Sequence, residues 1–296
     1  MVSSCPGQAL SVWAPAKINL FLRVIGRRPD GYHDIETRMQ KLGLSDHLCI
    51  ISQNKGISLS CPGIDLPEDE TNLAFKAALF FYRHTGISHG IKIDLEKKIP
   101  IAAGLGGGSS DAAAVLKGMN RLFGTGLDSE SLADMARSLG ADVPFFVSDF
   151  QAADATGIGD RLLEIQGLNN FSVVLVNPGF SVSTKWVYEN FALTTQGNPY
   201  MLASGSDPDA ESGRYPCGED FSGFFNDLES VTISRYPEVG RIKEQLLTDG
   251  ARSALMSGSG PTVFGLFADY KKAEASFGKF RLLYSDVFLT KPCEWN

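Results

Sequence analysis

The chain contains the run Pro100-Ile101-Ala102-Ala103-Gly104-Leu105-Gly106-Gly107-Gly108-Ser109-Ser110, which leads directly into a segment with helical spacing. Four glycines within five residues leave no Cβ atom to keep a ligand from the backbone, and they tolerate positive φ angles. We expect Ser109 or Ser110 to cap the helix and Asp111 to lie in its first turn, where a negative charge suits the helix dipole. Free N–H groups beside the positive end of a helix bind phosphate oxygens, so the run predicts a phosphate site.

The segment that follows, residues 111–123, predicts a helix with one buried face. Its apolar side chains recur at the spacing of such a face, at Ala112, Val115, Leu116, Met119, Leu122 and Phe123.

The glycine-rich run does not match the two best-known phosphate loops. A P-loop needs a lysine directly after its last glycine, but Gly108 is followed by two serines and the nearest downstream lysine is Lys117. The dinucleotide pattern G-x-G-x-x-G would need glycine at position 109. A flexible linker or a tight turn is the alternative interpretation.

Composition sets the outer bounds. With 296 residues, 43% hydrophobic and 21% charged, the chain suits two globular domains, which we place at 1–168 and 169–296. The net charge of −7 argues against general nucleic-acid binding. No apolar run approaches the roughly 18 residues of a membrane span, and residues 1–9 lack the regions of a signal peptide and are too short for a transit peptide. These features predict a cytoplasmic, bacterial-type protein that needs neither a membrane nor a nucleic acid.

Cysteine and histidine usage points away from structural metal. The five cysteines form no C-x-x-C pair, and their odd number fits a reducing compartment. The four histidines show no metal-ligand spacing, so structural zinc is not expected.

Alternation, helical spacing and turn residues predict the other elements. Before the glycine-rich run we expect a strand over 18–24, a turn over 27–33, two strands over 39–44 and 47–52, a helix over 72–84 capped by Thr71, and a strand over 91–95. After the central helix we expect a helix between Asp128 and Gly140, strands over 151–156, 161–165 and 171–176, a mobile acidic loop over 203–220, and a second glycine-rich turn over 256–262 before a strand over 263–267.

Three of these segments resemble the motifs of the galactokinase–homoserine kinase–mevalonate kinase–phosphomevalonate kinase superfamily. They are Pro15-Ala16-Lys17-Ile18-Asn19-Leu20, the run over 100–110, and Gly258-Ser259-Gly260-Pro261. Arg28-Pro29-Asp30-Gly31-Tyr32-His33 and Leu139-Gly140-Ala141-Asp142-Val143-Pro144 resemble one branch of it. The resemblance implies an α+β fold of two domains with ATP and substrate in the cleft between them, and ATP phosphates on residues 100–110. It also implies phosphorylation of the 2-hydroxyl of a cytidine diphosphate-linked methylerythritol, in the non-mevalonate route to isoprenoid precursors.

The resemblance makes Asp142 the base that accepts the proton of the attacking hydroxyl, and Lys17 its partner. By itself Asp142 would be interpreted as a helix N-cap before Val143-Pro144, and Lys17 as a surface lysine at a strand start. Magnesium bound with ATP would neutralise charge. Ser110 is a candidate metal contact, but no carboxylate accompanies it and the metal ligands stay unknown.

Two further residues are implied near the nucleotide, Asn72 and Lys97. Asn72 could equally be a first-turn helix residue, and Lys97 a solvated charge at the end of a strand.

For the substrate, the resemblance and the chemistry of cytosine point to the same turn. A cytosine ring offers two π faces and a donor–acceptor edge, which Tyr32 and His33 could meet, with Tyr188 in the second domain as a further aromatic. Simple packing beside Trp186 is the alternative for Tyr188. Asn19 and Thr184 are candidate hydrogen-bond partners for the polyol or the diphosphate.

Two other function classes stay open. One is a kinase or decarboxylase of the same superfamily acting on homoserine or mevalonate-type substrates, against which the Asp-Gly-Tyr-His turn argues. The other is a catalytically silent nucleotide-binding regulator, against which the presence of both Lys17 and Asp142 argues. We expect a monomer or a weak dimer.

Overall fold

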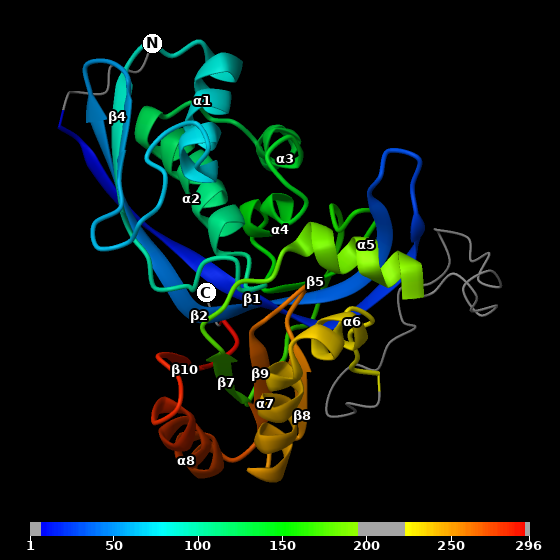
Figure 1. Cartoon of the computed structure of the whole chain (residues 1–296). Coiled ribbons are helices and arrows are strands. Elements are labelled where there is room, and N and C mark those ends of the chain that lie inside the picture. The colour runs from blue at the N-terminus through cyan, green and yellow to red at the C-terminus, as the bar shows by residue number, and fades with distance from the viewer. Residues whose placement is uncertain (1–6, 195–222, 294–296) are drawn as a thin grey trace. The chain divides into compact units, whose positions relative to one another are not determined.

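The structure is a computed structural model that describes residues 7–194 and 223–293 (Figure 1). It is an α+β chain with two compact units. The first unit comprises residues 7–17, 42–101 and 106–150, and the second comprises 18–41, 102–105, 151–194 and 223–293. The chain therefore passes between the units several times, and the domain boundary after residue 168 stays a prediction. The acidic loop expected over 203–220 lies outside the described residues.

The strands form two sheets. Six strands make the first, β1 (Ala9–Arg27), β2 (His33–Gln53), β3 (Ile57–Ser60), β4 (Gly90–Glu96), β5 (Ala152–Thr156) and β6 (Arg161–Ile165). Four antiparallel strands make the second in the order β10-β7-β9-β8, with bounds Asp286–Thr290, Ser172–Asn177, Val263–Phe267 and Ser253–Met256. The strands expected at 18–24, 91–95, 151–156, 161–165, 171–176 and 263–267 are thus confirmed.

The expectation of two strands over 39–44 and 47–52 was wrong. Residues 33–53 form the single strand β2, which pairs with β5 over 37–40 and with β4 over 47–53. The chain stays extended through Asp46 because its carboxylate accepts N–H groups from Lys98 and Ile99 instead of closing a turn.

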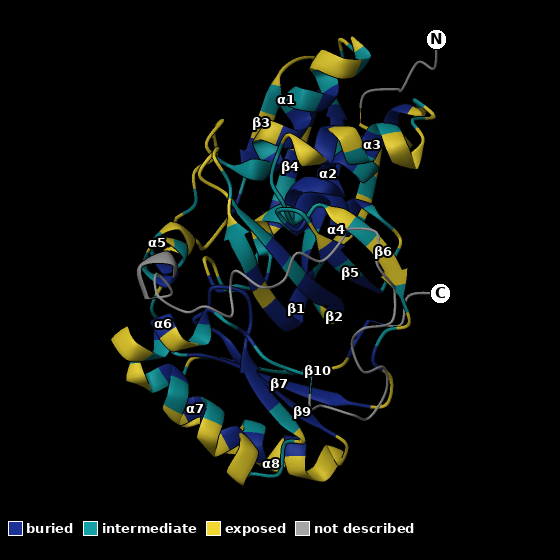
Figure 2. Cartoon of the chain, turned by 90° about the vertical axis from the view of Figure 1, so that its right-hand side faces the viewer, coloured by how far each residue is buried: buried dark blue, intermediate teal, exposed yellow. Residues whose placement is uncertain are grey.

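The first unit is built around a buried helix. It contains α1 (Leu73–Thr85), α2 (Gly107–Phe123), α3 (Ser129–Arg137) and α4 (Val143–Val147), and α2 contacts the other three. The apolar face predicted for residues 111–123 is confirmed, since its members are all buried and α2 is the dark helix of this unit in Figure 2. Asn72, and not Thr71, caps α1, because the Asn72 side chain accepts from the N–H of Ala74.

The second unit has its core between the four-stranded sheet and its helices. These helices are α5 (Thr184–Thr194), α6 (Glu229–Arg235), α7 (Pro237–Thr248) and α8 (Tyr270–Arg281). All six residues of β7 are buried, and one apolar cluster joins the strands to α5, α7 and α8. Figure 2 shows the exposed outer faces of α7 and α8 in yellow.

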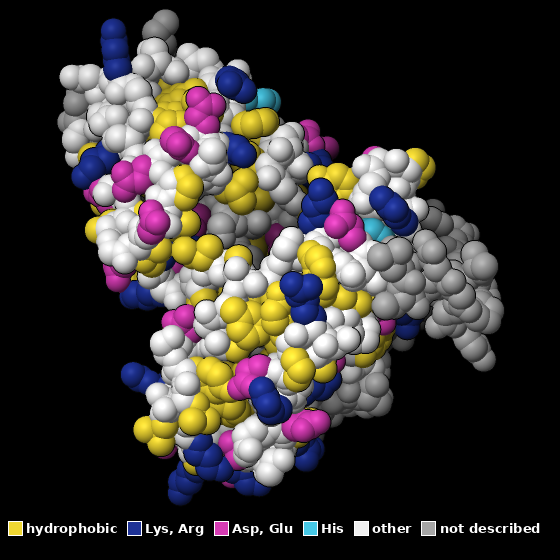
Figure 3. Space-filling model, viewed as in Figure 1, with side chains coloured by type: hydrophobic (Ala, Val, Ile, Leu, Met, Phe, Trp, Pro, Cys, Tyr) yellow, Lys and Arg dark blue, Asp and Glu magenta, His cyan; other side chains and the backbone are white. Residues whose placement is uncertain are grey.

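No helix among the described residues is long and apolar enough to cross a membrane. On the face shown in Figure 3, acidic and basic side chains are interspersed instead of forming a broad field of one sign.

Close packing of α2 on β2 gives the first prediction. A Cβ atom at Gly118 would lie 2.5 Å from Cδ1 of Ile50. Gly118→Val should therefore lower the free energy of unfolding by about 1–3 kcal/mol through overpacking. The matched control is Gly278→Val in α8, where a Cβ atom meets nothing within 4 Å. Urea unfolding of both variants measures the difference, and equal stabilities would show that α2 does not need a glycine there.

Candidate functional site

The glycine-rich run forms a loop whose backbone alternates into the left-handed region. The φ angles of Ala102, Gly104 and Gly106 are 51°, 78° and 72°. Alternation of this kind turns successive N–H groups toward one concave side, which is the geometry of an anion-binding nest. The first turn of α2, which begins at Gly107, also leaves N–H groups without intrahelical partners.

The cap of α2 differs from the expectation. Gly106 occupies the N-cap position, and Ser109 and Ser110 lie inside the helix, so neither serine caps it. Asp111 lies beyond the first turn, where it is buried beside a lysine instead of facing the helix dipole. Among the four glycines of the run, Gly104 and Gly106 have positive φ angles, whereas Gly107 and Gly108 already belong to the helix.

The second glycine-rich turn supports the middle of the loop, within the second unit. The Ser257 hydroxyl donates to the Gly104 carbonyl at 2.9 Å, and the Thr262 N–H donates to the Ala103 carbonyl at 3.4 Å. A Cβ atom on residue 104 would lie 2.1 Å from the Ser257 carbonyl oxygen, so only glycine fits this contact.

A buried amide holds that second turn in place. Asn226 donates to the carbonyls of Met256 and Gly258 at 2.8 and 2.7 Å and accepts the N–H of Leu228 at 3.0 Å. At the far side of the turn, the Ser259 hydroxyl is hydrogen-bonded to the Thr184 hydroxyl at the start of α5, at 2.8 Å.

Lys17 and Asp142 form an ion pair in the first unit. Lys17 Nζ lies 3.3 Å from Asp142 Oδ2, and the two side chains are 5% and 32% exposed. Asp142 occupies the N-cap position of α4, but its side chain makes no capping hydrogen bond, so capping does not account for the carboxylate. A Cβ atom at Gly106 would lie 3.1 Å from Lys17 Cγ and 2.8 Å from the Phe146 ring, which puts the lysine stem against the end of the loop.

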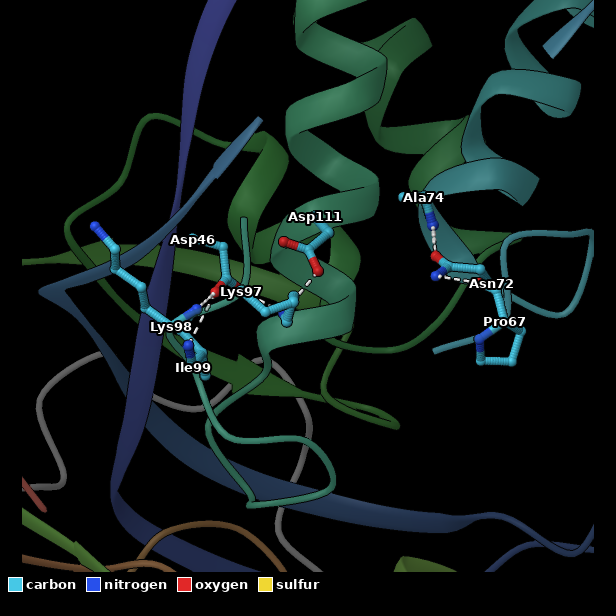
Figure 4. Close-up of polar contacts among 8 residues, drawn as sticks. All are labelled: Asp46, Pro67, Asn72, Ala74, Lys97, Lys98, Ile99 and Asp111. Carbon is cyan, nitrogen blue, oxygen red and sulfur yellow. Dashed lines mark hydrogen bonds and ion pairs between the residues drawn. The ribbon is translucent and has the colours of Figure 1, made fainter. Parts of the chain in front are cut away.

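Lys97 lies in a buried charged cluster (Figure 4), and not at a solvated strand end. Its ammonium donates to Asp46 and, at 2.8 Å, to Asp111. Burial alone would lower the pKa of Lys97, but the fields of Asp111 and Asp46 outweigh burial and raise it. Burial raises the pKa of Asp111 to about 7, with Lys97 opposing the shift.

Two polar atoms at the start of α2 have no partner among the described residues. They are the Ser110 hydroxyl and Oδ1 of Asp111, both fully buried as atoms. Buried polar atoms cost free energy when unpaired, so an orphaned hydroxyl beside the loop marks a position that a ligand group could satisfy. Within the described part of the chain, no group of three or more His, Cys, Asp or Glu residues could hold a metal ion.

The turn after β1 and helix α5 bring two aromatic rings together in the second unit. The His33 and Tyr188 rings stack with centroids 5.0 Å apart and an interplanar angle of 28°. His33 Nε2 is buried and without a hydrogen-bond partner in the described structure. Burial and the nearby Arg27 lower the pKa of His33, so it is neutral at neutral pH and can either donate or accept. Tyr32 is 61% exposed at the same turn.

The remaining expected site residues have local partners. Asn19 is buried and donates to the Thr37 hydroxyl at 2.8 Å. Asn72 caps α1, and its Nδ2 donates to the Pro67 carbonyl at 2.9 Å (Figure 4).

Sequence reasoning missed Asp46, Asn226 and Ser257 as parts of this site. The sequence pattern places Asp46 between two strands, and no spacing connects residue 46 with residues 97–111. The sequence places Ser257 in a glycine-rich turn, but its hydrogen bond to residue 104 joins segments that are far apart along the chain.

Comparisons with known proteins agree on one kind of kinase. The profile described as GHMP kinases N terminal domain matches residues 72–149, and that described as GHMP kinases C terminal matches 213–284. The 4-diphosphocytidyl-2-C-methyl-D-erythritol kinase of Syntrophotalea carbinolica is 47% identical over 267 residues, which are 90% of this chain and 92% of that protein. The kinase of the same name from Syntrophus aciditrophicus is 44% identical over 289 residues, 97% and 96% of the two chains.

Solved structures show the same likeness. A crystal structure of 4-(cytidine 5'-diphospho)-2C-methyl-D-erythritol kinase matches with a TM-score of 0.79 at 32% identity, covering 96% of this chain and all of that one. Homoserine kinase from Cytophaga hutchinsonii matches with a TM-score of 0.67 at 19% identity, covering 96% and 95%, and this likeness concerns the fold alone.

The buried Asp111 carboxyl predicts a pH effect on stability. Its pKa rises from an ordinary 3.8 to about 7, so the folded state binds the proton more tightly than the unfolded state does. The stability that proton binding to Asp111 contributes is fully present below its pKa in the unfolded state. It is lost as the pH rises through its pKa in the folded state. Asp111→Asn has no carboxyl group to lose a proton, so the variant does not lose stability in this way. Between the ordinary pKa of 3.8 and the folded-state pKa of about 7, its free energy of unfolding relative to wild type should therefore rise with pH, by on the order of 1 kcal/mol per pH unit at most.

Urea unfolding at a series of pH values measures this difference. The control is Asp94→Asn, which removes one carboxylate from an exposed ion pair with Lys92. A pH-independent difference between Asp111→Asn and wild type would show that Asp111 is ionised throughout.

Proposed function

Because the chain belongs to the 4-diphosphocytidyl-2-C-methyl-D-erythritol kinases of the GHMP kinase superfamily, we propose that it transfers the γ-phosphoryl group of ATP to the 2-hydroxyl of 4-diphosphocytidyl-2-C-methyl-D-erythritol. The family consists of ATP-dependent small-molecule kinases of the non-mevalonate isoprenoid pathway. We also propose which hydroxyl accepts the phosphoryl group, which residues act on it and which residues bind each substrate.

Asp142 is the proposed base, and Lys17 its partner. The observation that carries this assignment is the 3.3 Å ion pair beside the end of the loop, in which the lysine is almost fully buried and the carboxylate is partly open. The adjacent ammonium of Lys17 would stabilise the alkoxide character of the attacking oxygen. Since phosphoryl transfer has a loose transition state, Asp142 mainly orients the hydroxyl and takes its proton late.

Residues 100–110 are the proposed site for the ATP phosphates. The alternating left-handed residues and the open first turn of α2 support this assignment, because both present backbone N–H groups to an anion. Asn72 and Lys97 stay predictions as residues close to the nucleotide.

Magnesium is proposed to accompany ATP. The orphaned Ser110 hydroxyl fits an oxygen-preferring cation, and Ser110 is the residue that would contact it. When bound, the ion would neutralise charge on the transferred phosphoryl group.

The cytidine half is proposed to bind at Tyr32, His33 and Tyr188. The stacked His33 and Tyr188 rings provide a π surface, and His33 Nε2 supplies a buried polar atom that needs a partner. Asn19 and Thr184 are proposed hydrogen-bond partners for the polyol or diphosphate.

A cytoplasmic location and a monomeric or weakly dimeric state also stay predictions.

The alternative substrates are homoserine and mevalonate. They are set aside because the likeness to those kinases lies in the fold alone, whereas the cytidylyl-dependent kinases are 44–47% identical over nearly the whole chain. Assays of ATP consumption with the cytidylyl substrate, homoserine and mevalonate side by side test the proposal. Turnover of either alternative at a higher kcat/KM would overturn it.

Asp142→Asn is expected to keep ATP affinity and to lower kcat by about 10²–10⁴-fold, the usual contribution of a positioned base. Steady-state kinetics under saturating substrate give kcat, and nucleotide titration gives the affinity. Asp134→Asn in α3, an exposed aspartate paired with Arg137, is the matched control. Near-normal turnover of Asp142→Asn would leave the residue no catalytic role.

Tyr188→Ala should raise KM for the cytidylyl substrate roughly 5- to 150-fold, the loss of one base–aromatic stack, and leave ATP affinity unchanged. His33→Ala should also narrow the preference for cytidine over uridine analogues, since a polar reader discriminates between base edges. Steady-state kinetics with both analogues measure these effects. Equal phosphorylation of methylerythritol phosphate lacking the cytidyl group would contradict this account of recognition.

A further inference from the structure

The chain just before the phosphate loop is held by a carboxylate that no solvent reaches. The Asp46 side chain is 0% exposed, and its Oδ1 accepts the backbone N–H groups of Lys98 and Ile99 at 2.5 and 2.9 Å. Residue 99 is the last before the glycine-rich run begins. Asp46, in the middle of β2, therefore sets where the loop starts.

The chain just after the loop is held by the same cluster. Lys97 donates from Nζ to Oδ2 of Asp46 and to Oδ2 of Asp111, which lies in α2 (Figure 4). A Cβ atom at Gly107 would lie only 3.1 Å from Lys97 Nζ, so the ammonium lies against the first residue of the helix. All of these atoms belong to the first unit.

We propose that Asp46 is a positioning residue for ATP binding, because it anchors residues 97–99 at the entry of the phosphate loop and, through Lys97 and Asp111, the beginning of α2 at its exit. Asp46 is too deeply buried to contact the nucleotide, so it acts through the backbone. This inference rests on the proposed function in one respect, namely that ATP phosphates bind the loop.

The loop needs such anchors for a physical reason. Its glycines lose more conformational entropy on ordering than other residues do, and Ala102 holds a positive φ angle that is unfavourable for a residue with a Cβ atom. A charged cluster in a buried site has few alternative arrangements, because separating any member leaves an unpaired charge in a low-dielectric environment. The two ends of the loop are thereby held at one separation, and the N–H groups between them keep their directions.

The test compares Asp46→Asn with the matched control Asp94→Asn. Asparagine keeps an oxygen for the N–H groups of residues 98 and 99 but removes the charge that holds Lys97. Titration with a non-hydrolysable ATP analogue and Mg²⁺, without acceptor, should give a Kd about tenfold higher for Asp46→Asn, the effect of a slightly displaced binding group. Asp94→Asn should bind like wild type, and KM for the cytidylyl substrate should be unchanged in both.

A merely structural role for Asp46 predicts a different result. Stability would fall in chemical unfolding, but the folded protein would bind the analogue with unchanged Kd, and this outcome would overturn the proposal. Rescue of the affinity by Asp46→Glu, which restores the charge, would support it.

Asp111→Ala provides an independent variant that keeps the Asp46–Lys97 pair intact. It removes only the exit anchor and places alanine beside Ala112 in the helix. It should also raise the Kd for the analogue, and it decides the question if Asp46→Asn does not fold. Unchanged affinity in Asp111→Ala would then overturn the proposal. A wild-type protein that binds the analogue but leaves the cytidylyl substrate unphosphorylated would contradict the proposed function and not the positioning role.

Discussion

To bind phosphate as proposed, the backbone between residues 99 and 107 has to keep its N–H groups free of protein partners and yet hold them in a single geometry. In most loops the hydrogen bonds that give rigidity also use up the N–H groups, so the two requirements conflict. In this chain, hydrogen bonds to the residues before the loop and to carbonyl groups within it provide the rigidity. The flanking residues are fixed by the Asp46 carboxylate, and the carbonyls of residues 103 and 104 accept hydrogen bonds from Thr262 and Ser257.

Two lysine–aspartate arrangements flank the loop, and burial separates their roles. Lys97 and its two carboxylates are at most 4% exposed, which suits an anchor whose charges never meet solvent or substrate. Lys17 is equally buried, but its partner Asp142 is 32% exposed and can reach a hydroxyl group. The same chemical pair is thus suited to a structural role where both carboxylates are buried, and to the proposed proton transfer where the carboxylate is partly open.

The second glycine-rich turn connects the loop proposed to bind ATP phosphates with the helix proposed to recognise the substrate. Ser257 and Thr262 contact residues 103 and 104, and Ser259 is hydrogen-bonded to Thr184 at the start of α5. Tyr188 follows Thr184 by four residues, so the two side chains lie on one face of that helix. The superfamily's third motif therefore has a structural explanation in this chain, as the support shared by two proposed binding elements.

The sequence alone determined the features that depend on neighbours along the chain. Periodicity was sufficient for α2, where burial of one face repeats about every 3.6 residues, and alternation or a continuous apolar run was sufficient for six of the strands, of which β7 and β9 are buried at every residue. The glycine-rich run was sufficient to expect left-handed backbone, which Gly104 and Gly106 adopt, and its role as a phosphate site stays a prediction. The motif order was sufficient for the family, and it nominated Lys17 and Asp142, whose catalytic roles stay proposals.

The tertiary structure decided what depends on segments distant in the chain. Periodicity could not show that β2 continues through Asp46, because the N–H groups of residues 98 and 99 that occupy its carboxylate are about fifty residues away. Nor could it show that Gly106 replaces a serine as the cap of α2, or that Lys97 is buried between two carboxylates. Local sequence patterns indicate which backbone conformation a residue favours and which face of a helix or strand is buried. The pairing of buried charges is settled only when strands and helices pack, because only then does the loss of water make an unpaired charge costly.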